Sequence, residues 1–261
     1  MAERKKRLMG EAPSVPRIIF VDANVFFAPR MRDIFMHLHE AEVLSIHWTK
    51  EVEAEWTRNV VTKHGADQTL IRACVHGMRD AAEDWEVSGY AKHVDRFAAV
   101  NFKDRHVAAA AYKLSLDDWP DQSVALVTKN IKDFPQEAFK GTQVTVCSMS
   151  EYLDLLVTTE PELVIRTVDR CRRKLKAPKL SHEEYVAVLM GNGCAGLANA
   201  LALRWNVECP KVAKDGTFYY SSEDLPRRTG TKSKHPSGKT YFPQVGRRIW
   251  TQLGARVERA Y

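Results

Sequence analysis

Four acidic residues lie on or directly beside predicted helices and strands: Asp22, Glu55, Asp104 and Asp133. Clustered carboxylates repel one another, and removing even one charge from water is costly. Such a cluster is therefore stable only when cations neutralise it. Oxygen ligands without a thiolate or a clear histidine pair select hard ions, Mg²⁺ or Mn²⁺. These ions bridge a phosphate and lower the pKa of a bound water, so the four residues predict a metal site for phosphoester chemistry.

Each acid also has a plain structural interpretation. Asp22 and Asp133 suit turns, Asp104 suits the N-cap of a helix, and Glu55 could be an ordinary surface glutamate. Taken singly, none of the four is strong evidence. Their joint occurrence in this order favours a functional site.

The elements that must position these acids alternate along the chain. Buried strands are predicted at 17–21, 44–48, 123–128 and 142–148. Helices are predicted at 31–43, at 50–61 with Thr49 as N-cap, from Leu70 to Ala82, at 104–116, and after Ser150 as N-cap, with a connector at 87–103. This alternation predicts an α/β fold with a parallel sheet covered on both faces.

Ligands bind outside the carboxyl ends of the strands of such a sheet. Asp22 directly follows the first strand, and Thr128, Asn130 and Asp133 follow the strand at 123–128. Glu55 lies beside the apolar stripe of its helix, because residues three and four apart share a face. Asp104 opens an alanine-rich helix whose face looks toward the sheet. We therefore expect the four acids near one edge of the sheet.

The chain after Pro161 has a different pattern. Two or three amphipathic helices are predicted at 162–175 and 181–204, and "GNGCAG" (191–196) is read as the turn between two of them. It fits GxGxxG but follows a helix, whereas the dinucleotide-binding fingerprint follows a strand. The predicted organisation is a basic leader at 1–16, an α/β domain at 17–158, a helical extension at 159–203 and a basic, possibly disordered tail at 204–261.

Composition is that of a globular, cytoplasmic protein. Of the 261 residues, 44% are hydrophobic and 28% charged, and no run approaches a membrane span. The leader lacks the apolar core of a secretory signal, and five scattered cysteines indicate reduced thiols. The net charge is +6, and the tail holds 12 Lys and Arg against 5 Asp and Glu. A basic tail suits a polyanionic partner or is simply solvated.

Four motifs in this order carry a family resemblance: Asp22-x-Asn24, Glu55-Trp56, "DRHVAAAA" (104–111) and "VTKNIKDF" (127–134). Together they resemble the PIN-domain nucleases, closest to the VapC-type toxin ribonucleases with a helical carboxyl-terminal segment. The resemblance covers 17–158 and, more loosely, 159–203. The tail after 204 matches nothing in it.

The resemblance implies a three-layer α/β/α domain and a divalent-metal-dependent endoribonuclease, with Mg²⁺ or Mn²⁺ as cofactor. It implies that Asp22 and Asp104 bind metal directly, that Glu55 holds a metal or orients its water, and that Asp133 acts through water or a second ion. Asn24, Thr128 and Asn130 would support the acids or bind phosphate. The nearby basic residues Arg105, Lys129, Lys103 and Lys132 are candidates to hold the RNA backbone, and the alternative for each is a solvated loop charge. The implied partners are an RNA substrate, a cognate antitoxin and a second copy of the chain, with no membrane.

Two other classes of function stay open. One is phosphotransfer with Asp22 as nucleophile, although a dehalogenase-type phosphatase would want an acid where Asn24 stands, and a receiver domain would want its lysine on a later strand than Lys129. The other is a non-catalytic nucleic-acid-binding protein that works through its basic tail. Substitution of Asp22 by Asn separates an enzyme from a binder.

Overall fold

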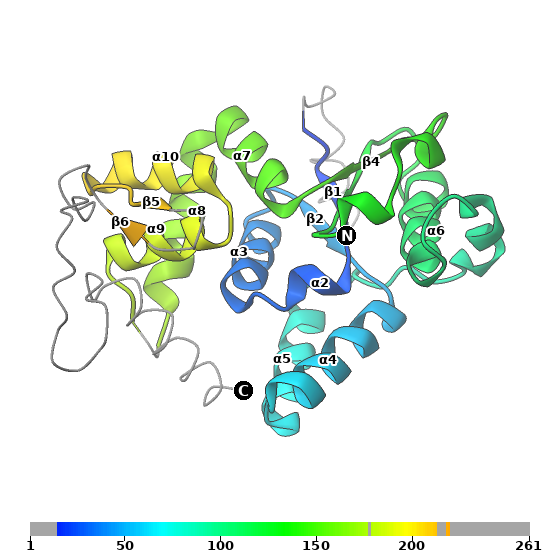
Figure 1. Cartoon of the computed structure of the whole chain (residues 1–261), viewed down its shortest axis with the longest axis horizontal. Coiled ribbons are helices and arrows are strands. Elements are labelled where there is room, and N and C mark those ends of the chain that lie inside the picture. Colours follow the sequence, from blue (N-terminus) through cyan, green and yellow to red (C-terminus); the bar gives the residue numbers. More distant parts are fainter. Residues whose placement is uncertain (1–14, 177–178, 213–217, 220–261) are drawn as a thin grey trace, which may run out of the picture.

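A four-stranded parallel sheet with the order β2-β1-β3-β4 forms the centre of the molecule in the computed structural model (Figure 1). The model describes residues 15–176, 179–212 and 218–219. The strands are β1 (Ile18–Val21), β2 (Ser45–His47), β3 (Val124–Val127) and β4 (Val144–Cys147). In register, Ile19 lies opposite Ile46 of β2 on one side and Ala125 of β3 on the other.

The two inner strands show why the sheet is covered on both faces. Every residue of β1 and β3 is buried, although alternate side chains of a strand point to opposite faces. Near-continuous apolar runs of this kind are typical of parallel strands between helical layers. The edge strand β4 is only partly buried. The predicted α/β fold with a parallel sheet is confirmed, and the arrangement is compatible with three layers.

Nine α-helices connect and cover the strands in the described part of the chain. They are α2 (Ala23–Phe26), α3 (Pro29–Glu40), α4 (Lys50–His64), α5 (Gln68–Ala81), α6 (Arg105–Lys113), α7 (Met149–Thr159), α8 (Pro161–Lys174), α9 (His182–Gly191) and α10 (Ala195–Trp205). Figure 1 shows α6 on one side of the sheet, α8 to α10 beyond α3 on the other, and α4 with α5 as a projecting pair.

Two N-caps were predicted, and the structure confirms one of them. The Thr49 hydroxyl accepts a hydrogen bond from the Val52 amide and so caps α4. The prediction of Ser150 as the cap of α7 is wrong. Ser148 caps this helix, because its hydroxyl accepts from the Glu151 amide while the Glu151 carboxylate accepts from the Ser148 amide. This reciprocal capping box is available only to the serine three residues before the glutamate.

The predicted connector at 87–103 contains helical structure of its own. A 3₁₀ helix spans Tyr90–Phe97 and a second spans Phe102–Asp104. The first packs against the domain through Phe97, which is fully buried. The centroid of its ring lies 5.8 Å from that of Tyr112 and 5.3 Å from that of Phe139. Further short turns follow: a π-helical turn at Leu114–Asp118 and 3₁₀ turns at Ile131–Asp133 and Gln136–Phe139.

The carboxyl-terminal helices share the core of the sheet domain. Val164 and Val168 of α8, Tyr185 of α9 and Leu197 of α10 are buried in the same hydrophobic cluster as β1. The turn between α9 and α10 follows Gly191, as predicted for "GNGCAG". The Asp154 carboxylate of α7 accepts a hydrogen bond from the Leu197 amide at 3.0 Å and thereby caps α10 across the interface.

The ends of the chain are described only in part. Val15 is already buried, and the Pro16 carbonyl accepts a hydrogen bond from the Tyr152 hydroxyl, so the packed domain includes residues just before Arg17. Of the predicted tail, a two-stranded antiparallel ladder pairs β5 (Lys211–Val212) with β6 (Phe218–Tyr219). The rest of the tail from 220 and the leader at 1–14 lie outside the described residues.

Two predictions from composition can be compared with the structure. All five cysteines are free thiols. Within residues 15–176 and 179–212, no helix combines the length and the apolar character that crossing a bilayer requires.

Candidate active site

Asp22 lies where the order of the strands reverses. The chain leaves β1 to form β2 on one side and returns to form β3 on the other, so β1 and β3 flank the switch point at which open α/β sheets bind ligands. The Asp22 amide donates to the Val127 carbonyl at 3.0 Å, which extends the pairing of the two strands by one residue. The Asp22 side chain thus begins at the carboxyl edge of the sheet, as predicted.

Three of the predicted polar residues surround this carboxylate. The Thr128 hydroxyl donates to Asp22 Oδ2 at 2.7 Å, and the side-chain amide Nδ2 of Asn24 donates to the same oxygen. Asn24 Oδ1 in turn accepts from the Lys129 amide at 2.9 Å, and Thr128 Oγ1 accepts from the Asn130 amide at 3.0 Å. Two turns that follow different strands therefore fix one carboxylate.

The protonation of Asp22 reflects its buried position. Only 5% of the residue is exposed, and this burial raises its pKa to about 6. The hydrogen bond from Thr128 lowers the pKa, whereas the nearby charges of Asp104 and Glu55 raise it. Burial outweighs the hydrogen bonds, so an ionised Asp22 at neutral pH is an unfavourable charge that a cation would stabilise.

Asp104 belongs to the same electrostatic group. Its burial raises the pKa of its carboxyl, the charges of Asp133 and Glu55 raise it further, and His106 lowers it. The charge of Asp104 thus acts on Asp22, that of Glu55 acts on both, and that of Asp133 acts on Asp104. The structure brings all four predicted acids within electrostatic range, although they come from four separate segments of the chain.

Helix capping does not account for Asp22 or Asp104. Asp22 precedes α2 and Asp104 precedes α6, yet neither carboxylate forms a capping hydrogen bond with its helix. A carboxylate at a helix N-terminus normally accepts such a bond from one of the free amides. Capping therefore does not explain why these two positions carry acids.

The chemistry of the donors fits a hard divalent cation, because all four groups are carboxylates. In the part of the chain that the structure describes, however, no three His, Cys, Asp or Glu side chains are arranged to hold a metal ion. The acids are near enough to repel one another but do not converge as ligands. The metal site stays a prediction.

The predicted basic residues differ in what they can bind. The Arg105 guanidinium donates to the Ala98 carbonyl at 2.7 Å and to the Val100 carbonyl at 3.2 Å, so it is largely used within the protein. Lys129, Lys103 and Lys132 are exposed. These lysines are the cations at this edge that are accessible to a polyanion.

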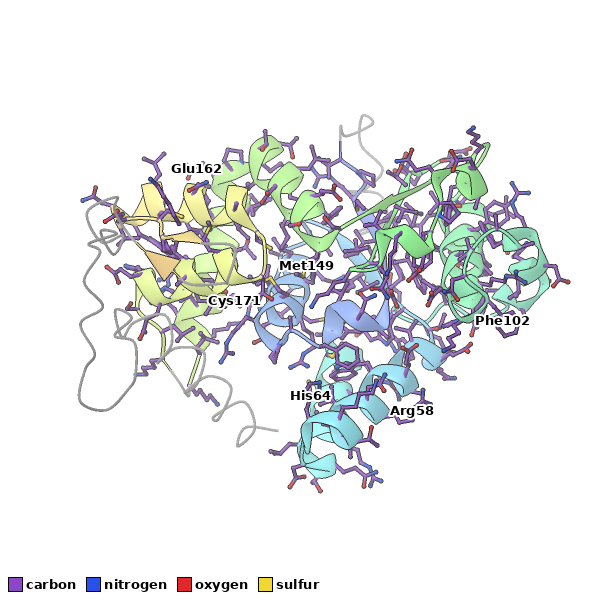
Figure 2. The ribbon with its side chains drawn as sticks, in the orientation of Figure 1. Arg58, His64, Phe102, Met149, Glu162 and Cys171 are labelled. Atoms are coloured by element: carbon purple, nitrogen blue, oxygen red, sulfur yellow. The ribbon has the colours of Figure 1, made fainter. Side chains whose placement is uncertain are left out.

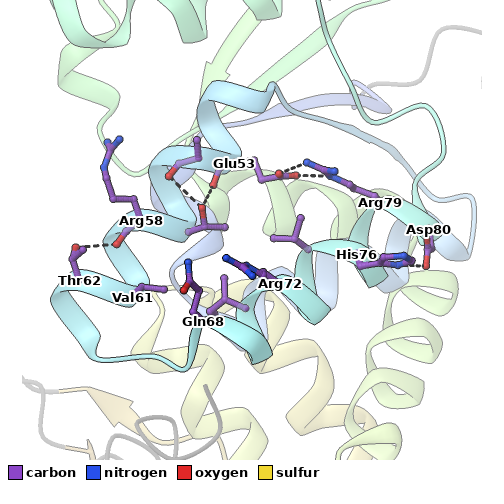
Figure 3. Close-up of a pocket in the computed structure, with 13 residues that line it drawn as sticks. Glu53, Arg58, Val61, Thr62, Gln68, Arg72, His76, Arg79 and Asp80 are labelled. Atoms are coloured by element: carbon purple, nitrogen blue, oxygen red, sulfur yellow. Dashed lines mark hydrogen bonds and ion pairs between the residues drawn. The ribbon is translucent and has the colours of Figure 1, made fainter.

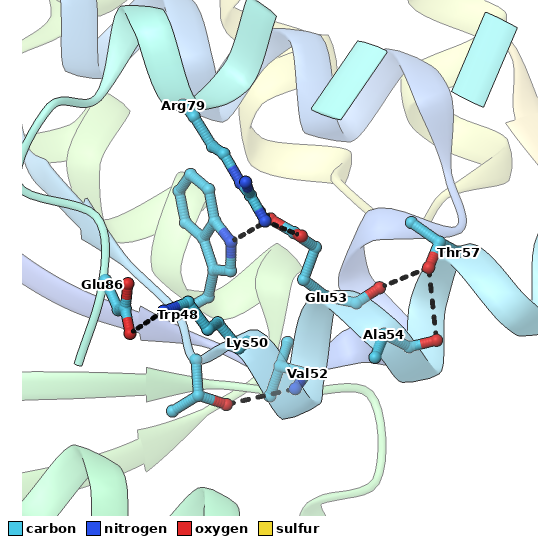
Figure 4. A network of polar contacts seen from close by, with 9 residues as sticks. Trp48, Lys50, Val52, Glu53, Ala54, Thr57, Arg79 and Glu86 are labelled. Carbon is cyan, nitrogen blue, oxygen red and sulfur yellow. Dashed lines mark hydrogen bonds and ion pairs between the residues drawn. The ribbon is translucent and has the colours of Figure 1, made fainter. Parts of the chain in front are cut away.

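The sequence did not indicate the role of Glu53. It is buried, and its carboxylate accepts two hydrogen bonds from the Arg79 guanidinium of α5 and one from Trp48 Nε1 at 3.3 Å (Figure 4). The guanidinium also lies 4.9 Å from the centroid of the Trp85 ring, which stacks on Trp48. This network joins α4 to α5 and to the end of β2.

A groove runs between α4 and α5 on the side of α4 that carries Glu53 (Figure 3). Ile71 and Val75 contribute apolar surface to it, and Arg58 and Arg72 contribute positive charge. Glu55 does not line this groove, so the groove and the acidic cluster are separate features of α4. The apolar stripe predicted for α5 is only partly covered, since Ile71 is buried while Leu70 is 47% exposed.

A polar contact beside the acids was also missed. Glu51, one turn before Glu55, accepts a hydrogen bond from the Tyr90 hydroxyl at 3.0 Å and lies 3.8 Å from Nδ1 of His106. The long 3₁₀ segment that supplies Tyr90 was predicted as a connector, which left the partner of Glu51 unidentified.

Comparison of the chain with protein-family models, curated proteins and solved structures gave no match. The features of the chain that bear on its function are the acidic cluster and the motifs of the sequence.

Proposed function

We propose that this chain is a divalent-metal-dependent endoribonuclease with a three-layer, PIN-like nuclease domain. The observation that carries the proposal is the electrostatic coupling of Asp22, Glu55, Asp104 and Asp133 at the carboxyl edge of β1 and β3. Asp22 is buried there, its pKa is raised to about 6, and its carboxylate caps no helix. Ionised acids in such surroundings reduce stability, and groups with strongly shifted pKa values are concentrated at functional sites.

The residues of the site would have the following roles. Thr128 and Asn24 fix the orientation of the Asp22 carboxylate through Oδ2. Asp22 and Asp104 would bind Mg²⁺ or Mn²⁺, with Glu55 and Asp133 turning toward them as further ligands or water-positioning groups. The bound ion supplies charge stabilisation for a phosphate and lowers the pKa of a water. Lys129, Lys103 and Lys132 would attract the RNA backbone.

The biological role is proposed on the resemblance of the motifs alone. A VapC-type toxin would be restrained by a cognate antitoxin and would act as a homodimer. Expression of the wild-type chain should then arrest growth, and Asp22→Asn should relieve the arrest.

The test is cleavage of total RNA with Mg²⁺ or Mn²⁺, read by sequencing the new 5′ ends. Asp22→Asn should lower the cleavage rate by about 100-fold or more, because it removes a charge from the ion site. Glu162→Gln, at an exposed position on α8, is the matched control and should cleave like the wild type.

Each result has a defined meaning. Cleavage that needs no divalent ion, or that survives Asp22→Asn, would contradict the proposal. Retained RNA binding without any cleavage by the wild type would instead support a non-catalytic binder.

A further inference from the structure

Phe102 is a large aromatic residue that is exposed to solvent. It is 79% exposed, whereas Phe20, Phe26, Phe35, Phe97 and Phe134 are fully buried. It lies in the 3₁₀ turn Phe102–Asp104, two residues before the acid Asp104 (Figure 2). Figure 2 shows it at the edge of the molecule, below α6. A single exposed hydrophobic residue is ordinary, so what distinguishes Phe102 is its place beside the candidate active site.

Arg105 supports the ring from one side. Its guanidinium carbon lies 5.5 Å from the centroid of the Phe102 ring. The guanidinium is itself fixed by hydrogen bonds to the Ala98 and Val100 carbonyls. A cation held over one face favours the ring in this position, and the high exposure leaves the rest of the ring accessible.

The backbone of this turn is also fixed, and it is joined to the acidic cluster. The Asn101 side chain accepts from the Lys103 amide at 3.2 Å, and the Asp104 amide donates to the Asn101 carbonyl at 2.8 Å. The Asn101 amide donates to the Asp133 carbonyl at 3.2 Å. The segments that carry Asp104 and Asp133 therefore lie side by side, and Phe102 is presented at their edge.

The surroundings of Phe102 suit a nucleic acid. Ile131, in the adjoining turn, is 39% exposed, and Lys103 and Lys132 are exposed on the same two turns. Aromatic surface interleaved with cations is the pattern by which proteins bind single strands: bases stack on the ring while lysines attract the phosphates.

We propose that Phe102 is a stacking platform for an unpaired base of the RNA whose phosphate enters the acidic cluster. This inference rests on the proposed nuclease function and adds to it a residue, Phe102, that binds the substrate next to the acids. A base within a duplex is already stacked and paired, so it cannot lie flat on Phe102 without being unstacked. The platform would therefore direct the enzyme to loops and single-stranded regions.

The test measures binding of a fluorescein-labelled, single-stranded oligoribonucleotide of mixed sequence by anisotropy, in the Asp22→Asn background without divalent ions. Phe102→Ala should weaken binding by about 5- to 100-fold, the range expected for loss of one stacked base. Phe102→Tyr keeps the ring and should bind within about 2-fold of the parent. Leu203→Ala is the matched control, because Leu203 is 85% exposed on α10, and it should not change binding.

An abasic oligonucleotide of the same length separates stacking from attraction to the backbone. Its affinity should be the same for the parent and for Phe102→Ala. Equal affinity of the two proteins for the normal oligonucleotide, no binding by the parent, or an equal loss for the abasic strand would overturn the platform. Binding of single-stranded DNA in place of RNA would overturn the RNA assignment.

Cleavage assays distinguish an error in the proposed role of Phe102 from an error in the proposed nuclease function. If the wild type cleaves RNA through Asp22 but Phe102→Ala leaves affinity for the oligonucleotide unchanged, the platform is wrong and the nuclease stands. If Phe102→Ala weakens binding but the wild type does not cleave, the platform stands and the nuclease is wrong.

Discussion

Asp22 combines two properties that oppose each other. Only 5% of the residue is exposed, yet its carboxylate accepts hydrogen bonds that favour the ionised form. Burial is the larger effect, since the pKa rises from 3.8 to about 6. Such a rise corresponds to about 3 kcal/mol of unfavourable free energy when the group is ionised in the folded protein.

Asp22 should therefore make its own contribution to the dependence of stability on pH. From about pH 4 to about pH 6, the folded protein binds the Asp22 proton more tightly than the unfolded chain does. The stability that Asp22 contributes is fully present below pH 4 and is lost as the pH rises through 6. The asparagine of Asp22→Asn does not ionise. The free energy of unfolding of this variant should therefore rise relative to that of the wild type by up to about 3 kcal/mol as the pH increases across this range.

Urea unfolding of both proteins at intervals from pH 4 to pH 8, without divalent ions, measures this difference. Glu162→Gln should show no comparable trend, because Glu162 is exposed. A difference between Asp22→Asn and the wild type that stays constant with pH would show that Asp22 titrates normally. Addition of Mg²⁺ at pH 7 should stabilise the wild type selectively if the proposed site binds it.

Individual residues of the cluster were predictable to different degrees. Asp22 and Thr128 follow apolar strands, so their place at the edge of a parallel sheet follows from the local pattern. Asp104 and Asp133 became a pair through the hydrogen bond between the Asn101 amide and the Asp133 carbonyl, which joins segments more than 30 positions apart along the printed sequence. Local patterns contain no information about such a contact.

At the scale of elements, α4 places three glutamates in different surroundings, with Glu51 and Glu55 on one face and Glu53 on another. Glu51 is exposed and contacts Tyr90 and His106, Glu53 is buried against Arg79, and Glu55 acts on Asp22 and Asp104. The position of Glu55 therefore depends on the orientation of α4, which the contact between Glu53 and Arg79 helps to fix.

Loss of this contact should destabilise the fold. Arg79→Met keeps the aliphatic stem beside Trp85 but leaves the buried Glu53 carboxylate with one partner fewer, so we expect a loss of about 1–3 kcal/mol in urea unfolding. The exposed ion pair between Lys50 and Glu86 is the matched control: Glu86→Gln should cost less than about 1 kcal/mol.

The double variant tests the cause. Glu53→Gln in the Arg79→Met protein removes the unpaired charge, so the double variant should be more stable than Arg79→Met alone. If it is less stable, the charge of Glu53 is not what makes the loss of Arg79 costly.

The predictions for α4 and α7 differ in outcome for a local reason. Thr49 was recognised because it directly precedes an apolar helical pattern. Ser148 and Ser150 both precede the next helix, and only the position of Glu151, three residues after Ser148, distinguishes them. The burial of Glu53 had no such local signal, because its partner lies 26 residues away.

At the scale of the whole molecule, the carboxyl-terminal helices are bound to the sheet domain by close contact between α7 and α10. A Cβ atom on Gly196 would lie 2.7 Å from Cγ of Asp154, the side chain that caps α10. The glycine of "GNGCAG" nearest this contact therefore serves helix packing, which agrees with the interpretation of the motif as a turn.

Gly196→Ala should destabilise the protein by about 1–3 kcal/mol, because the added methyl group displaces the Asp154 carboxylate from the Leu197 amide. Gly77→Ala is the matched control. Gly77 lies exposed in α5 with nothing within 4 Å of the new methyl group, so this change should stabilise by about 0.5–1 kcal/mol. Thermal unfolding compares the two, and stabilisation by Gly196→Ala would contradict the close contact.

The pairing of β1 with a strand much later in the chain has a consequence for synthesis and folding. The hydroxyl that holds Asp22 comes from Thr128, 106 positions later in the chain. Contacts so remote in sequence form slowly, because a long loop must close first. A polypeptide that ends shortly before Thr128 contains Asp22, Glu55 and Asp104 without the residue that holds Asp22. Only a chain made past Asp133 can assemble all four.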